Sequence, residues 1–149
     1  MSIQQVLFAS GIPPAGQQSY TSAGSFTWTA PAGVTSVCAV CVGAGGNEST
    51  AAGDGGGGLG WKNNIPVVPG QSYQVVVGAQ GTSGANGQDS WFVTYTTVRG
   101  MGGAVGGTNN GGTGGGYTGD GGGNGGNGGS ANGNRGGGGG AGGYSGNGG

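Results

Sequence analysis

Two cysteines three positions apart are the residues whose type and spacing first suggest chemistry. Cys38 and Cys41 form a Cys-x-x-Cys motif, which in other proteins binds zinc or exchanges thiols and disulfides. The motif lies inside a β-type run at residues 34–42, and an odd spacing in a strand places two side chains on opposite faces. The chain contains no histidine and no second Cys-x-x-Cys. We therefore interpret both cysteines as small buried hydrophobic residues, and we expect no metal and no cofactor.

The other polar residues form no recognisable catalytic arrangement. There is no pair of carboxylates at a familiar spacing and no basic group near a candidate nucleophile. Gly53, Gly55 and Gly58 match the spacing of a dinucleotide-binding fingerprint, but almost any glycine run does so, and the helix that the fingerprint needs is missing. We expect that the protein is not an enzyme.

Charge is scarce along the whole chain. Three basic and four acidic residues among 149 give a net charge of −1. Phosphate binding needs clustered Lys and Arg, so we expect no nucleic-acid partner. The first residues lack a basic region, the apolar stretch at residues 6–9 is too short for a signal peptide, and no stretch is long enough to span a bilayer. We expect a protein made in the cytoplasm, without membrane insertion.

The stretch that must position everything else is the glycine-rich tail. Residues 100–149 contain 29 glycines and no proline. Such a composition is usual in flexible linkers. If the tail is ordered, collagen is excluded because it needs proline and a strict three-residue glycine period, and a steric zipper is excluded because it needs side chains. The remaining candidate is a bundle of polyproline II helices made of glycine, packed closely because glycine has no Cβ.

The bundle cannot stabilise itself. Fixing fifty backbones costs about 50–100 kcal/mol, and the tail offers only four large apolar side chains in return. The first 99 residues or other copies of the chain must therefore support it. Residues that recur every third position are expected to mark the outer edges of the helices: Asn124, Asn127 and Ser130, and again Ala141, Tyr144 and Asn147.

Alternating and apolar runs before the tail predict β-strands. The runs at residues 34–42 and 73–78 are apolar on both faces, so we expect a cover on each side of them. Residues 90–95 are expected to be the last strand, with Trp91, Val93 and Tyr95 on one side. No amphipathic helix pattern occurs. The predicted fold class is all-β, a small antiparallel β-sandwich of jelly-roll type with a polyglycine II helix bundle and no α-helix.

The patterns along the chain predict three regions. Residues 1–23 form an N-terminal arm or edge strand. Residues 24–99 form the β-sandwich, with a glycine-rich excursion at residues 43–60 that leaves the sheet and joins the tail. Residues 100–149 form the polyglycine II bundle.

Several motifs resemble a known family. They are Phe-Thr-Trp-Thr-Ala-Pro-Ala-Gly-Val-Thr-Ser-Val at residues 26–37, Gly-Ala-Gly-Gly at 43–46, Pro-Gly-Gln-Ser-Tyr-Gln-Val-Val-Val-Gly at 69–78, and the glycine tail. This succession resembles a glycine-rich domain of bacteriophage tail-fibre and adhesin-like proteins, over residues 26–149. The tail departs from the adhesin pattern because its glycine blocks are unequal and a β domain precedes it.

The resemblance implies a structural virion protein, a tail-fibre or surface-appendage subunit with a rigid spacer or a host-contact tip. The implied partners are other copies of the chain, expected as a homotrimer, and other virion proteins, and the implied location is the virion. Two alternatives stay open. One is a self-assembling extracellular fibre or surface-layer protein, and the other is a glycan- or ice-binding module.

If the protein contacts a host, a surface glycan is the expected target, because aromatic faces and amides can bind sugars without net charge. The candidate receptor-binding residues are the decorated points of the tail: Tyr117, Asp120, Asn124 and Tyr144. The alternative is that both tyrosines only anchor the bundle against the sandwich.

Overall fold

The computed structural model describes residues 16–47, 51–133 and 135–149, and no helix occurs within these ranges. Residues 1–15 of the predicted N-terminal arm or edge strand lie outside the described residues. The strands are β1 (Gly24–Thr29), β2 (Ser36–Val42), β3 (Leu59–Pro66), β4 (Ser72–Val77), β5 (Ser90–Phe92), β6 (Val98–Gly100), β7 (Tyr117–Thr118) and β8 (Gly121–Gly123).

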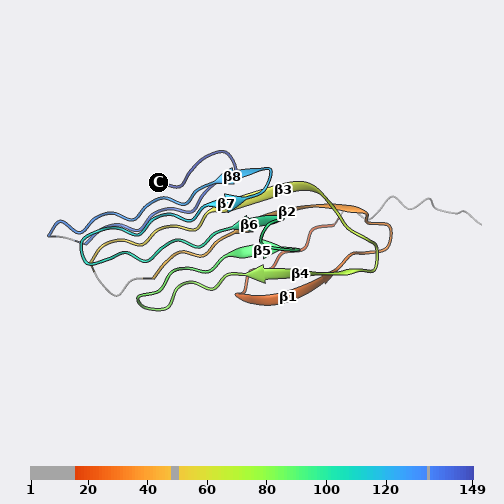
Figure 1. Ribbon diagram of the computed structural model, residues 1–149, viewed down its shortest axis with the longest axis horizontal. Coiled ribbons are helices and arrows are strands. Elements are labelled where there is room, and N and C mark those ends of the chain that lie inside the picture. Colours follow the sequence, from red (N-terminus) through yellow and green to blue (C-terminus); the bar gives the residue numbers. More distant parts are fainter. Residues whose placement is uncertain (1–15, 48–50, 134) are drawn as a thin grey trace, which may run out of the picture.

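These strands form two sheets. The larger has the order β1-β4-β5-β6-β7 and the smaller has the order β2-β3-β8, and every pairing is antiparallel. The two sheets lie at one end of an elongated molecule, and the glycine-rich segments extend from them toward the other end (Figure 1). The prediction of an all-β fold without helices is confirmed for the described residues.

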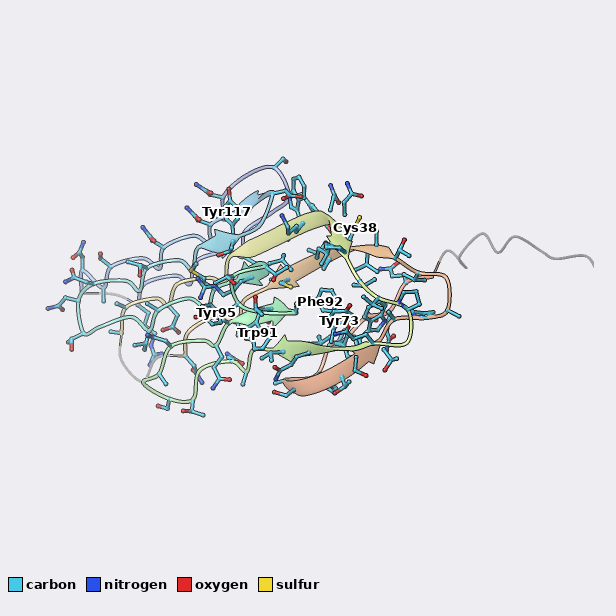
Figure 2. The ribbon with its side chains drawn as sticks, turned by 45° about the vertical axis from the view of Figure 1, so that its right-hand side comes forward. Cys38, Tyr73, Trp91, Phe92, Tyr95 and Tyr117 are labelled. Atoms are coloured by element: carbon cyan, nitrogen blue, oxygen red, sulfur yellow. The ribbon has the colours of Figure 1, made fainter. Side chains whose placement is uncertain are left out.

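The core forms between the two sheets. Cys41 and Ile65 come from the smaller sheet, and Phe92 and Val98 come from the larger one. Figure 2 shows Phe92 close to Tyr73, with ring centroids 6.3 Å apart. Because alternate residues of a strand face the same way, one face of each sheet supplies these side chains.

The connection between β3 and β4 follows the chemistry of its residues. Gly70 has φ of +80°, and Gln71 N donates to Val68 O at 3.0 Å. Proline at the second position and glycine at the third suit a type II turn, because only glycine adopts positive φ there without strain. A type II turn therefore lies at Pro69 and Gly70.

The strand predicted at residues 90–95 is shorter than expected. β5 ends at Phe92, Val93 has φ of +64°, and the chain turns back into β6. Thr97 N donates to Thr94 O at 3.0 Å, and the two threonine hydroxyls lie 2.9 Å apart. The prediction was wrong because threonine favours strands but also forms local turn hydrogen bonds.

The expectation that β2 is covered on both faces was also wrong. Cys41 is buried between the sheets, whereas Val40 and Val42 on the other face are each 45% exposed. Valine suits a pleated strand on either face, so a valine-rich run does not by itself show burial on both sides.

Candidate functional site

A glycine-rich segment from the middle of the chain lies at the centre of the other glycine-rich segments. We call residues 52–58 the central segment; all of them are buried except Asp54, which is half-buried. The segment continues directly into β3. Its backbone is hydrogen-bonded to five other stretches, at residues 43–46, 101–104, 112–115, 126–129 and 139–142. The excursion between β2 and β3 is therefore enclosed mainly by the tail.

These hydrogen bonds recur every third residue. Gly53 N and Gly56 N donate to Gly129 O and Gly126 O at 2.9 and 3.0 Å. With other neighbours the step is again three residues on both chains. Gly55 N and Gly58 N donate to Ala104 O and Met101 O, Gly112 N and Gly115 N donate to Gly53 O and Gly56 O, and Gly139 N and Gly142 N donate to Asp54 O and Gly57 O. Successive residues of the central segment thus face different neighbours.

At most glycines of the central segment there is no room for a side chain. A Cβ at Gly57 would overlap the carbonyl of Gly43, and a Cβ at Gly53 would overlap the carbonyl of Gly137. By contrast, nothing lies within 4 Å of the position that a Cβ would take at Gly137 or Gly146. Close contact between backbones therefore requires glycine at the centre and not at these outer positions.

We call the central segment and the glycine-rich stretches that surround it the array. Asparagine and aspartate side chains accept hydrogen bonds in this array where a backbone carbonyl does not reach. Asn127 Oδ1 accepts a hydrogen bond from Gly114 N, and Asp54 Oδ1 accepts one from Gly106 N, both at 2.9 Å. Asn86, Asp89 and Asn147 accept from the backbone N–H groups of Val105, Gly102 and Asn124 in the same way. These side chains satisfy N–H groups that would otherwise lack a partner in the array.

Asp120 fastens the tail to the smaller sheet. Lys62 Nζ donates to Asp120 Oδ1 at 2.7 Å, and Asn63 N donates to Asp120 Oδ2 at 2.9 Å. Asp120 N also donates to Trp61 O. The hydrogen bond from Lys62 is the main reason that the pKa of Asp120 lies below its usual value, and the bond from Asn63 N lowers this pKa further.

The outer face of β2 and β3 carries an open hollow beside this contact. Val40 and Trp61 are register partners on these strands. The indole ring of Trp61 lies against Gly121 of β8, and its Nε1 donates to Tyr144 O at 3.4 Å. The hollow is lined by Cys38, Ala39, Val40, Trp61, Asn63 and Tyr144.

The four residues predicted to bind a receptor are therefore divided among different surroundings. Tyr144 lines the hollow and is 63% exposed, and Asp120 lies next to it. Tyr117 is 38% exposed, and its ring lies against Gly122, where a Cβ would come too close to the ring. Asn124 contributes its backbone to the array, since its carbonyl accepts a hydrogen bond from Gly148 N.

Cys38 and Cys41 have opposite surroundings, as expected from their odd spacing. Cys38 is exposed and Cys41 is buried, and both are free thiols. The interpretation of both as buried residues was therefore wrong for Cys38. Burial raises the pKa of Cys41 to about 11. Among the described residues no group of three or more potential metal ligands occurs.

Comparison with known proteins identifies the family of this chain. A family model for a glycine-rich domain matches residues 21–149. The chain belongs to the glycine-rich domain family. No curated protein and no solved structure matches the chain. Within the part of this glycine-rich domain that the structure describes, no helix has the length and apolar character needed to cross a membrane.

Sequence reasoning overlooked two polar or aromatic residues of the glycine-rich domain that border the hollow, Trp61 and Asn63. Both lie in β3, at positions for which the sequence patterns predicted no strand. The available signal was their spacing of two, because residues two apart in a strand share a face. Their proximity to Tyr144 depends on the path of the tail, and no local sequence pattern predicts that path.

Proposed function

We propose that this glycine-rich domain is a structural subunit of a virion appendage, a tail fibre or similar surface structure, in which the glycine array forms a rigid spacer that carries a host-contact surface. The observation that carries the proposal is the hydrogen bonding of the central segment to five neighbouring stretches. A segment held on several sides by backbone hydrogen bonds resists bending, and a spacer needs this property. The resemblance to phage tail-fibre and adhesin-like proteins supports the viral context.

We infer that the segments of the array are polyglycine II helices. A polyproline II-type helix has three residues per turn and no internal hydrogen bonds, so its N–H and C=O groups are directed to neighbours with a period of three. The three-residue step from Gly53 to Gly56 and from Gly55 to Gly58 agrees with this period. An α-helix would direct its groups along its own axis, and a strand would repeat every second residue.

In this proposal the two sheets form a sandwich that serves as the base of the spacer. The central segment leads into β3, and the stretch at residues 43–46 continues from β2. Each of these two glycine segments is therefore anchored at one end by a strand, which reduces the entropy that it loses when it packs. The base would join three copies of the chain and other virion proteins, and the array would extend outward.

Immunogold electron microscopy on particles from cells that carry the gene tests this role. Antibodies against the purified chain should label appendages at fixed positions on virus particles. Labelling of long filaments or of the surface of uninfected cells would instead support a self-assembling fibre or surface-layer protein, and it would reject the virion role. Light scattering on the purified chain tests the homotrimer, and a monodisperse monomer would reject self-association.

A further inference from the structure

We propose that the hollow on the outer face of β2 and β3 binds a neutral carbohydrate, with Trp61 and Tyr144 as its aromatic contacts. This inference rests on the proposed host contact and gives it a place and a ligand class. It moves the contact away from Tyr117 and Asn124, which do not line the hollow.

The shape and lining of the hollow fit a small ligand of mixed character. Binding sites for small molecules are concave, mostly apolar, and carry a few polar groups that fix orientation. Here Val40 provides apolar surface, and the exposed side chain of Asn63 can offer both a hydrogen-bond donor and an acceptor. A sugar ring presents C–H groups on its faces and hydroxyl groups around its rim, so the lining matches both parts of it.

The Trp61 ring is held in place from the side that faces away from the hollow. Trp61 lies against Gly121, where a side chain would collide with the indole, and its Nε1 is directed to the backbone of Tyr144. The ion pair between Lys62 and Asp120 ties the neighbouring strand position to the tail that carries Tyr144. A preformed site loses less entropy on binding than a mobile one. The partly positive C–H groups of a sugar are attracted to the negative face of an aromatic ring.

Charge argues for a neutral ligand. None of the six residues that line the hollow is charged, and the nearby Lys62 and Asp120 neutralise each other across 2.7 Å. An anionic ligand would need an unpaired cation at the site, and a cationic ligand would need a free carboxylate. Hexoses and N-acetylhexosamines carry neither charge, and the amide of Asn63 suits both.

The residual apolar exposure of β2 agrees with a surface that is covered when the protein works. Val40 remains 45% exposed although its strand composition is that of a buried strand. Tyr144 is 63% exposed. Exposed apolar groups gathered beside polar ones are typical of binding surfaces.

The test is binding of the full-length purified chain to an array of neutral oligosaccharides built from hexoses and N-acetylhexosamines. Tyr144→Ala and Val40→Lys should each weaken binding about tenfold or more, because the first removes a ring and the second places a charge in the hollow. The matched controls are Tyr95→Ala and Val68→Lys, since Tyr95 and Val68 are both 59% exposed and do not line the hollow. Tyr95 lies in the connection between β5 and β6 of the larger sheet. Figure 2 shows it away from Cys38, which lines the hollow. Both controls should bind like the wild type.

Three results would overturn the inference. The first is that no oligosaccharide of the array is bound by the wild type. The second is that Tyr144→Ala and Val40→Lys bind as the wild type does, and the third is that the controls lose binding equally. The proposed virion role has its own readout in the labelling of particles, so a glycine-rich spacer that does not bind sugars would be recognised as such.

Discussion

Asp120 is the residue whose protonation should affect the attachment of the tail to the smaller sheet. Its carboxylate accepts hydrogen bonds from Lys62 Nζ and Asn63 N, and its pKa is lowered in the folded protein. A lowered folded pKa means that the contribution of Asp120 to stability is present above the usual aspartate pKa of about 3.9 and is lost as the pH falls through the folded pKa.

We therefore expect Asp120→Asn to reduce the free energy of unfolding at neutral pH, by a modest amount because the pair is exposed. The difference between wild type and variant should shrink as the pH falls from about 4 through the lower folded pKa of Asp120, where the carboxylate becomes neutral like the asparagine side chain. Denaturant unfolding of both proteins at several pH values measures it. A difference that stays constant down to a pH of about 2 would contradict the assigned role.

The two cysteines should differ in reactivity. The thiolate is the reactive form of cysteine. Cys41 is buried and its pKa is raised to about 11, whereas Cys38 is exposed. With a thiol reagent at mildly alkaline pH the native protein should incorporate one equivalent rapidly, and Cys38→Ser should abolish this fast phase. Cys41→Ser should leave it intact, and rapid labelling of Cys41 in the native protein would show that the core opens easily.

At the scale of elements, the glycines of the central segment and the outer glycines should respond differently to the same substitution. Gly57→Ala would place a methyl group on the carbonyl of Gly43, whereas Gly146→Ala would place it in open space. We expect Gly57→Ala to lower the free energy of unfolding by about 1–3 kcal/mol or more, and Gly146→Ala to leave it nearly unchanged or slightly higher. Thermal or denaturant unfolding measures both, and equal effects would mean that the array is not closely packed.

The side-chain acceptors of the array give a second test at this scale. Removing the Asn127 side chain leaves Gly114 N without its partner. We expect Asn127→Ala to cost about 0.5–2 kcal/mol of stability. Asn132→Ala is a suitable control, because Asn132 is exposed and its side chain forms no hydrogen bond with the described part of the chain. Unfolding of the two variants side by side measures the difference, and equal stability would show that Asn127 Oδ1 is dispensable.

Strands β2 and β4 could be predicted from the sequence because their information is local: the valine-rich runs at residues 34–42 and 73–78 located them. The end of β5 could not be predicted, because the positive φ of Val93 is imposed by the return to β6 and valine itself disfavours it. The open outer face of β2 was also missed, since composition does not tell which face a second layer covers.

The spatial order of the glycine segments is the feature that the sequence specifies least. Glycine has no side chain to specify a neighbour, so the tail predicts that backbones approach closely but not which ones. The central position belongs to residues 52–58, which continue directly into β3. For the same reason the meeting of Trp61 with Tyr144 could not be predicted, although Tyr144 and Asp120 themselves were among the candidates.

At the scale of the whole molecule, the array and the sheets should unfold together. The central segment continues into β3 without a break, Gly58 N donates to Met101 O directly after β6, and β8 joins the tail to β3. Elements that share their chain and their hydrogen bonds in this way form one cooperative unit. Native-state hydrogen exchange should therefore give the amides of Gly53, Gly55 and Gly56 about the same free energy of opening as the amides paired between β2 and β3. If these glycine amides exchanged through local opening while the strands stayed protected, the array would be a loosely held appendix to the sheets and could not act as a stiff spacer.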